Sequence, residues 1–146
     1  MSRRIFIAAL LAAVSAPAWA SDLKPGQWEM TMSMEGENLP SQLTEERTSQ
    51  MCLTGGEADD MGATMRERWR ESDCTDINLT REGNSIQAQA SCQQGGRTTS
   101  VDAHVTLHSD EHYTSEIVTT NDGTLTTRQA GQWVSSECEA GAGREG

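Results

Sequence analysis

The chain has 146 residues, enough for one domain of ordinary size, and a net charge of −11 from 22 acidic and 11 basic side chains. This charge excludes a basic surface for duplex nucleic acid and argues against adsorption to an anionic membrane. No motif in the sequence identifies a reaction. The sequence therefore predicts where the protein resides and how it folds, but it does not predict an activity.

Residues 1–20 are predicted to be a signal peptide. Two arginines precede an apolar run over residues 5–14, which is too short to anchor stably in a bilayer. Ala18 and Ala20 supply small side chains before the expected cleavage, which leaves Ser21 as the first mature residue. The arginine pair also resembles a twin-arginine signature, and either that route or the general one leads out of the cytoplasm. No second apolar run follows, so we expect an exported, periplasmic protein without a transmembrane segment.

The first predicted elements are two strands and a helix. Apolar residues alternate with polar ones from Trp28 to Met34, which predicts a strand with one apolar face, and a second strand is expected from about residue 45 to Cys52. Thr54 and Glu57 have the spacing of a capping box at the start of a helix. A helix over about residues 56–70 is therefore predicted. Its apolar stripe consists of Ala58, Met61, Met65 and Trp69.

Five further strands are expected after the helix. Alternating residues on both sides of a turn at Gly83 predict a β-hairpin, and alternation continues through Val101–Leu107, Tyr113–Ile117 and Thr124–Val134. We expect a mainly β fold, an antiparallel meander of about seven strands that forms a sandwich or a partly closed barrel with one short helix. The predicted organisation is a signal peptide (1–20), a single disulfide-bearing β domain (21–138) and a disordered tail (139–146).

Four cysteines are expected to supply the stability that a thin apolar core lacks. After residue 20 the chain holds only 14 Leu, Ile and Val residues and no Phe. An even number of cysteines in an exported chain favours two disulfides, for which three connectivities are possible. Cys74 and Cys92 lie nine residues on either side of Gly83, so the hairpin places them opposite each other. We therefore favour Cys74–Cys92, which leaves Cys52–Cys138. A zinc site is disfavoured because no cysteine pair has C-x2-C spacing.

The chain resembles the bacterial exported proteins catalogued as domain of unknown function 3617. The segment Leu23–Glu29 is similar to their L-x-P-G-x-W-E opening. The other similar motifs are Cys52-Leu53-Thr54 with Glu57, the cysteine-flanked hairpin at Gly83-Asn84, and Gly131-x-Trp133 with Cys138. A departure is Gly55-Gly56, where the family more often has a proline before the helix. The resemblance implies an exported, disulfide-bearing β protein and no assigned activity.

Two groups of residues could bind metal. Met30, Met32 and Met34 share one face of a strand, and thioether sulfurs favour Cu(I). The favoured interpretation is that this face is core, because methionine fills irregular gaps. A turn at Asp110 would place His108 opposite His112, which makes a two-histidine site conceivable, although a solvated face beside a turn is the favoured interpretation.

We therefore expect a non-catalytic periplasmic β protein with no cofactor. Its partner could be a small apolar ligand in a groove between helix and sheet, or another envelope component. The alternative is a periplasmic Cu(I)-binding protein that uses the methionine strand. No serine lies in a G-x-S-x-G motif, and all four cysteines are expected to be oxidised, so the sequence offers no catalytic residues.

Overall fold

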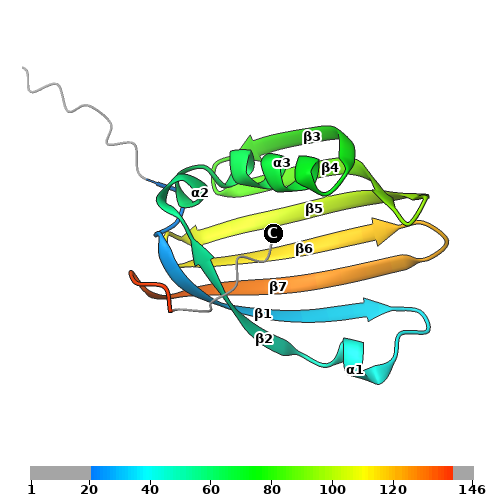
Figure 1. The fold of residues 1–146 in the computed structure, drawn as a ribbon, viewed down its shortest axis with the longest axis horizontal. Helices are drawn as coiled ribbons and strands as arrows, with labels where there is room; N and C mark the ends of the chain where they lie inside the picture. Colours follow the sequence, from blue (N-terminus) through cyan, green and yellow to red (C-terminus); the bar gives the residue numbers. More distant parts are fainter. Residues whose placement is uncertain (1–20, 140–146) are drawn as a thin grey trace, which may run out of the picture.

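The computed structural model describes residues 21–139, which form seven strands and three short helices (Figure 1). The strands are β1 (Gly26–Gly36), β2 (Arg47–Leu53), β3 (Cys74–Glu82), β4 (Ser85–Gln94), β5 (Arg97–Ser109), β6 (His112–Thr120) and β7 (Thr124–Ser135). The helices are α1 (Ser41–Thr44), α2 (Gly55–Asp59) and α3 (Met61–Glu71). Among these helices, none is long and apolar enough to cross a membrane. The predicted signal peptide and most of the predicted tail lie outside the described residues.

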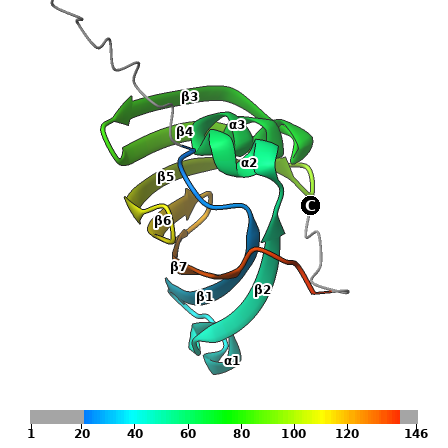
Figure 2. The same ribbon diagram turned by 90° about the vertical axis from the view of Figure 1, so that its left-hand side faces the viewer.

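All seven strands belong to one antiparallel sheet with the order β2-β1-β7-β6-β5-β4-β3. Strands β3 to β7 form a meander, and β1 joins it beside β7, so the first and last strands are neighbours. The sheet curls, and α2 and α3 lie against its concave side (Figure 2). The mainly β meander is confirmed, but the sheet is single and open, with β2 and β3 as its edges, so it does not form a sandwich.

Alternation along the strands directs one set of side chains to the concave face and the other to the convex face. Trp28 of β1 and Tyr113 of β6 are buried on the concave face, with their ring centroids 5.6 Å apart. The buried apolar cluster around them consists of Leu23, Met30, Leu53, Ala58, Met61, Ile86, Val105 and Leu107. The core therefore lies between the sheet and the two helices, where the predicted apolar stripes meet.

The single helix predicted over residues 56–70 is divided in two. Asp60 takes extended backbone angles, φ −139° and ψ 96°, and ends α2. Its carboxylate then accepts a hydrogen bond from the amide of Ala63 at 3.0 Å and caps α3. The predicted capping box is present, because Thr54 and Glu57 exchange side-chain to backbone hydrogen bonds at the start of α2. The break lets α3 change direction and lie along β3.

An ion pair ties the beginning of the domain to α3 and β3. Both Asp22 carboxylate oxygens accept hydrogen bonds from Arg81 of β3 at 2.7 Å. The same carboxylate accepts the amide of Met61, the first residue of α3, at 3.0 Å. The Arg81 guanidinium and the Met61 amide outweigh the opposing effect of burial and lower the pKa of Asp22. The chain before β1 therefore fixes the position of α3 over the sheet.

Both expected disulfides are formed. Cys74 and Cys92 are direct partners in the β3–β4 pairing, with Cα atoms 3.9 Å apart. Cys52 of β2 is bonded to Cys138, which follows β7, and their Cα atoms are 5.7 Å apart. The described cysteines include no free thiol. Each disulfide thus attaches one edge strand of the open sheet.

Candidate functional site

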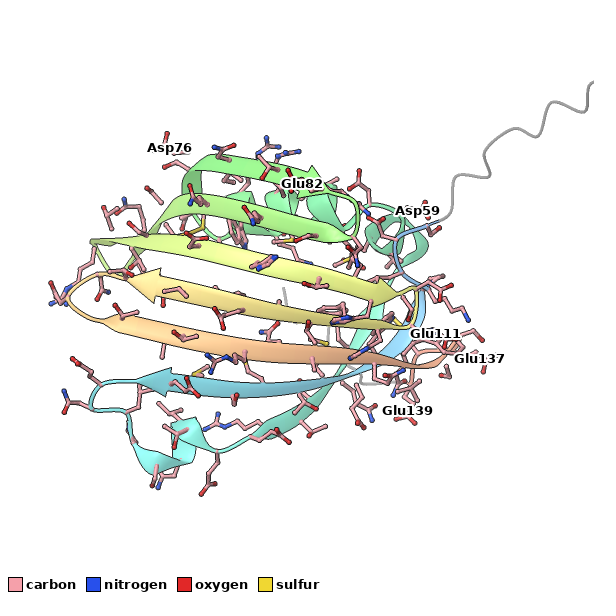
Figure 3. The ribbon with its side chains drawn as sticks, turned by 180° about the vertical axis from the view of Figure 1, so that it is seen from behind. Asp59, Asp76, Glu82, Glu111, Glu137 and Glu139 are labelled. Atoms are coloured by element: carbon pink, nitrogen blue, oxygen red, sulfur yellow. A yellow bond between two sulfur atoms is a disulfide. The ribbon has the colours of Figure 1, made fainter. Side chains whose placement is uncertain are left out.

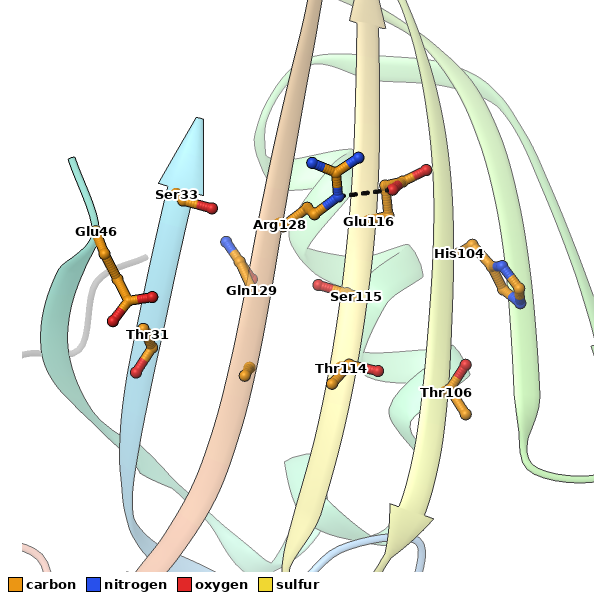
Figure 4. A pocket seen from close by; sticks show the side chains of 11 residues that line it. Thr31, Ser33, Glu46, His104, Thr106, Thr114, Ser115, Glu116, Arg128 and Gln129 are labelled. Atoms are coloured by element: carbon orange, nitrogen blue, oxygen red, sulfur yellow. Dashed lines mark hydrogen bonds and ion pairs between the residues drawn. The ribbon is translucent and has the colours of Figure 1, made fainter. Parts of the chain in front are cut away.

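Among the hollows of the described domain, two lie on opposite faces of the sheet. The convex face carries many polar and charged side chains (Figure 3), and its hollow has a volume of about 450 Å³. Arg128 lies in this hollow, but it is already paired with Glu116 at 3.0 Å (Figure 4) and also with Glu35 at 2.6 Å. The carboxylates of Glu35 and, to a lesser extent, Glu116 raise the pKa of Arg128. We interpret this hollow as a solvated surface whose one arginine is already paired with carboxylates.

The second hollow is a groove on the concave face, between α3 and the strands β1, β2 and β6, with a volume of about 310 Å³. We call it the methionine groove. Its apolar lining consists of Met30, Met32, Met51, Leu53, Met61, Met65, Trp69, Val105, Tyr113 and Ile117. Its polar lining consists of Ser49, Gln50, Thr64, Arg68, Ser115 and Gln129. This is an apolar concavity with a few polar groups, which is the usual composition of a small-molecule site.

Three elements bring five methionines into this groove. Met30 and Met32 come from β1. Met51 comes from the neighbouring strand β2, where it pairs with Trp28. Met61 and Met65 come from α3 at the helical spacing that the sequence predicted. Because methionine side chains are unbranched and polarisable, walls made of them adapt to ligands of different shape.

Three of the methionine sulfurs face hydrogen-bond donors. The Tyr113 hydroxyl donates to Met30 Sδ at 3.0 Å, and the Gln129 amide donates to Met32 Sδ at 3.5 Å. The Arg68 guanidinium lies 3.8 Å from Met51 Sδ. A thioether is a weak acceptor, and a guanidinium beside it opposes a metal cation electrostatically. Met34, the third methionine of the predicted Cu(I) set, does not line the groove.

Tyr113 lines the groove, and its ring lies against Gly131 of the sheet beneath it. Gly131 of β7 is the cross-strand partner of both Tyr113 and Met30. A Cβ atom at Gly131 would lie 2.8 Å from Cζ and 2.9 Å from Cδ1 of the Tyr113 ring, and closer still to Cε1. The absence of a side chain at Gly131 therefore lets the tyrosine ring lie flat on the sheet. Burial raises the pKa of Tyr113 to about 12, so its hydroxyl remains a hydrogen-bond donor at neutral pH.

Arg68 is the only charged residue among those that line the groove. Its Nη2 atom is paired with Glu57 Oε1 at 3.1 Å, and Glu57 is itself held by the amide of Thr54 at 2.8 Å. Burial opposes ionisation of Glu57, but the Thr54 amide and Arg68 outweigh it and lower the pKa of Glu57. Arg68 thus has a fixed carboxylate on one side and the groove on the other.

Two of the histidines, His108 and His112, lie close together, but their rings are not oriented as a metal site requires. The rings of His108 and His112 are stacked, with centroids 4.8 Å apart and planes 24° from parallel. Nitrogen lone pairs lie in the ring planes, so stacked rings direct them side by side and not toward one point. His108 Nε2 is also 2.8 Å from Thr114 Oγ1, and His104 Nε2 is 2.7 Å from Ser85 Oγ. Within residues 21–139, no group of three or more His, Cys, Asp or Glu side chains is placed to hold a metal ion.

The motif residues at both ends of the domain meet at one end of the sheet. The Trp28 indole donates to the Lys24 carbonyl at 2.9 Å, and the Trp133 indole donates to the Pro25 carbonyl at 3.1 Å. The Lys24 ammonium lies over the Trp133 ring, 4.9 Å from its centroid, and is paired with Glu111. These residues join the chain before β1, the β5–β6 turn and β7, and they support the fold from outside the groove.

The fold and the disulfides together define an antiparallel β protein with one curled sheet and an apolar groove on its concave side. The chain matches the family described as protein of unknown function, DUF3617, over residues 23–138, and it belongs to that family. The expected resemblance is thereby confirmed over nearly all of the described domain. No curated protein is significantly similar to the chain.

Proposed function

We propose that the chain is a non-catalytic, periplasmic protein that binds a small apolar ligand in the methionine groove. The observation that carries the proposal is the convergence of five methionines from β1, β2 and α3 on one concave surface. The volume of about 310 Å³ is at the lower end of the range for ligand pockets, which favours one small or slender molecule. The predicted signal peptide and the two disulfides support an oxidising, extracytoplasmic location.

A series of linear alcohols of increasing chain length tests apolar binding without involving charge. Each alcohol is titrated against the fluorescent apolar probe N-phenylnaphthylamine bound to the protein, and its displacement is measured. Each buried methylene contributes about 0.8 kcal/mol, so affinity is expected to rise about fourfold per methylene until the groove is full. A series without dependence on chain length would contradict the proposal.

A pair of tryptophan substitutions locates the binding site. Ser49 is exposed on β2 and lines the methionine groove, whereas Ser33 lies on the convex face of β1 and lines the other hollow. Ser49→Trp is expected to fill the groove and abolish probe binding, and Ser33→Trp is expected to leave it unchanged. Equal loss in both variants, or loss only in Ser33→Trp, would place the ligand elsewhere.

A second candidate function is Cu(I) binding. The five thioethers in one groove favour it, because β1 alone contributes only two of them. Against it stand the Arg68 cation beside Met51 and the donors that face Met30 and Met32. Apolar binding therefore accounts better for the groove.

A further inference from the structure

The position of Arg68 distinguishes the methionine groove from a purely apolar site. The protein carries a net charge of −11, yet the one charged side chain that lines the groove is positive. Arg68 projects from α3 at the boundary between the apolar walls and solvent, and its side chain is 37% exposed. An acidic protein repels anions over most of its surface, so a cation at a groove, even one with a carboxylate on its other side, favours that groove as the place where an anion binds.

The hydrogen bonds of Arg68 leave one side of its guanidinium available. Nη2 is paired with Glu57, which the capping box of α2 holds in place. Among the described residues, the hydrogen-bond partner of Nη1 is the Met51 sulfur at 3.8 Å, which is long and weak. A guanidinium has five donors in a planar fork, so an oxyanion at Nη1 would gain charge-assisted hydrogen bonds that a thioether does not provide.

We propose that the methionine groove binds a single-chain amphiphile with a carboxylate head group, whose alkyl chain lies on the methionines and whose carboxylate binds Arg68. This inference rests on the proposed function, because the alkyl chain occupies the same groove. The small volume favours one chain over the two chains of a diacyl lipid. Flexible methionine walls suit an unbranched alkyl chain, and a planar carboxylate matches the guanidinium fork.

Laurate and dodecanol form the decisive pair of probes, because they have the same chain length and differ in head group. Both are titrated by displacement of N-phenylnaphthylamine at neutral pH, below the concentration at which laurate forms micelles. Hydrogen bonds to a charged group predict that laurate binds at least about tenfold more tightly than dodecanol. Dodecyltrimethylammonium is expected to bind more weakly than dodecanol, because its head group repels Arg68.

Two arginine variants of α3 separate a direct contact from a general effect of charge. Arg68→Gln is expected to lower laurate affinity to that of dodecanol, while dodecanol affinity stays within about twofold. Arg70→Gln removes the same charge from an exposed position on α3 that does not line the groove, and is expected to leave both affinities unchanged. Dodecanol binding by Arg68→Gln also shows that this variant is folded.

The outcomes distinguish the inference from the proposed function. If dodecanol binds and laurate shows no preference, or if both arginine variants weaken laurate equally, the carboxylate inference is overturned and apolar binding stands. If neither probe binds the wild-type protein, both are overturned. Laurate preference that only Arg68→Gln removes supports the inference.

Discussion

Gly131→Ala is expected to destabilise the domain, because the new methyl group would enter the ring of Tyr113. Carbon atoms pack best at 3.5–4.0 Å, so a Cβ atom 2.8 Å from Cζ requires the ring to move by roughly 0.7 Å or more. Tyr113 is 6% exposed and packs against Trp28, so this movement disturbs the centre of the core. Overpacking of this kind costs about 2–3 kcal/mol.

Urea denaturation followed by tryptophan fluorescence measures this loss, with Gly123→Ala as the matched control. A Cβ atom at Gly123 meets no atom within 4 Å, so the control is expected to change the free energy of unfolding by less than about 0.5 kcal/mol. In a Tyr113→Leu background, Gly131→Ala is expected to cost less than in the wild type, because the ring is gone. A loss below about 0.5 kcal/mol for Gly131→Ala in the wild type would refute the packing argument.

Three further outcomes are expected. Trp69→Ala removes a half-buried side chain packed against the disulfide cluster of β3 and β4, and thermal or urea unfolding should show a loss of about 2–4 kcal/mol; a loss below about 1 kcal/mol would mean that the stripe is exposed. Asp22→Asn weakens the Arg81 pair, and because the pKa of Asp22 is lowered in the folded state, this stabilisation is full above its usual pKa and is lost as pH falls through the folded value. At neutral pH the free energy of unfolding of the variant should be about 1 kcal/mol below that of the wild type. The difference should shrink toward zero in acid, and a difference that does not change with pH would contradict the ion-pair account. Anaerobic titration with Cu(I) against a competing chelator should reveal no site of submicromolar affinity. A stoichiometric site that disappears when Met30, Met32 and Met34 are all replaced by leucine would favour the copper function.

Local patterns in the sequence predicted the strands and one disulfide well, because both depend on residues near one another in the chain. Alternation gave the strands, and the equal spacing of Cys74 and Cys92 about Gly83 gave the hairpin pairing that the structure shows. The helix break was missed because the apolar stripe continues at helical steps through Asp60. An acidic residue directly before Met61 is an N-cap signal that could have revealed it.

The sequence predicted a groove between helix and sheet, but it did not predict which residues line that groove. The sequence placed Met30 and Met32 on one strand face, and it placed Met65 on a helix stripe, without relating the two. Their meeting depends on the sheet order, since β2 flanks β1 and α3 crosses the concave face. The role of Arg68 at the groove was likewise hidden, because a single arginine on a charged helix surface carries no sequence signal.

The attachment of both edge strands by disulfides has a consequence for what happens before oxidation. A strand with one unpaired side offers its backbone amides and carbonyls to any other extended chain. Until Cys52 and Cys74 find their partners, no covalent bond holds β2 or β3 on the sheet, and detachment of either strand would also expose the edge of β1 or β4. The timing of oxidation therefore matters: early cross-linking keeps both edge strands in place, and delayed cross-linking leaves β1 and β4 open to intermolecular β-assembly.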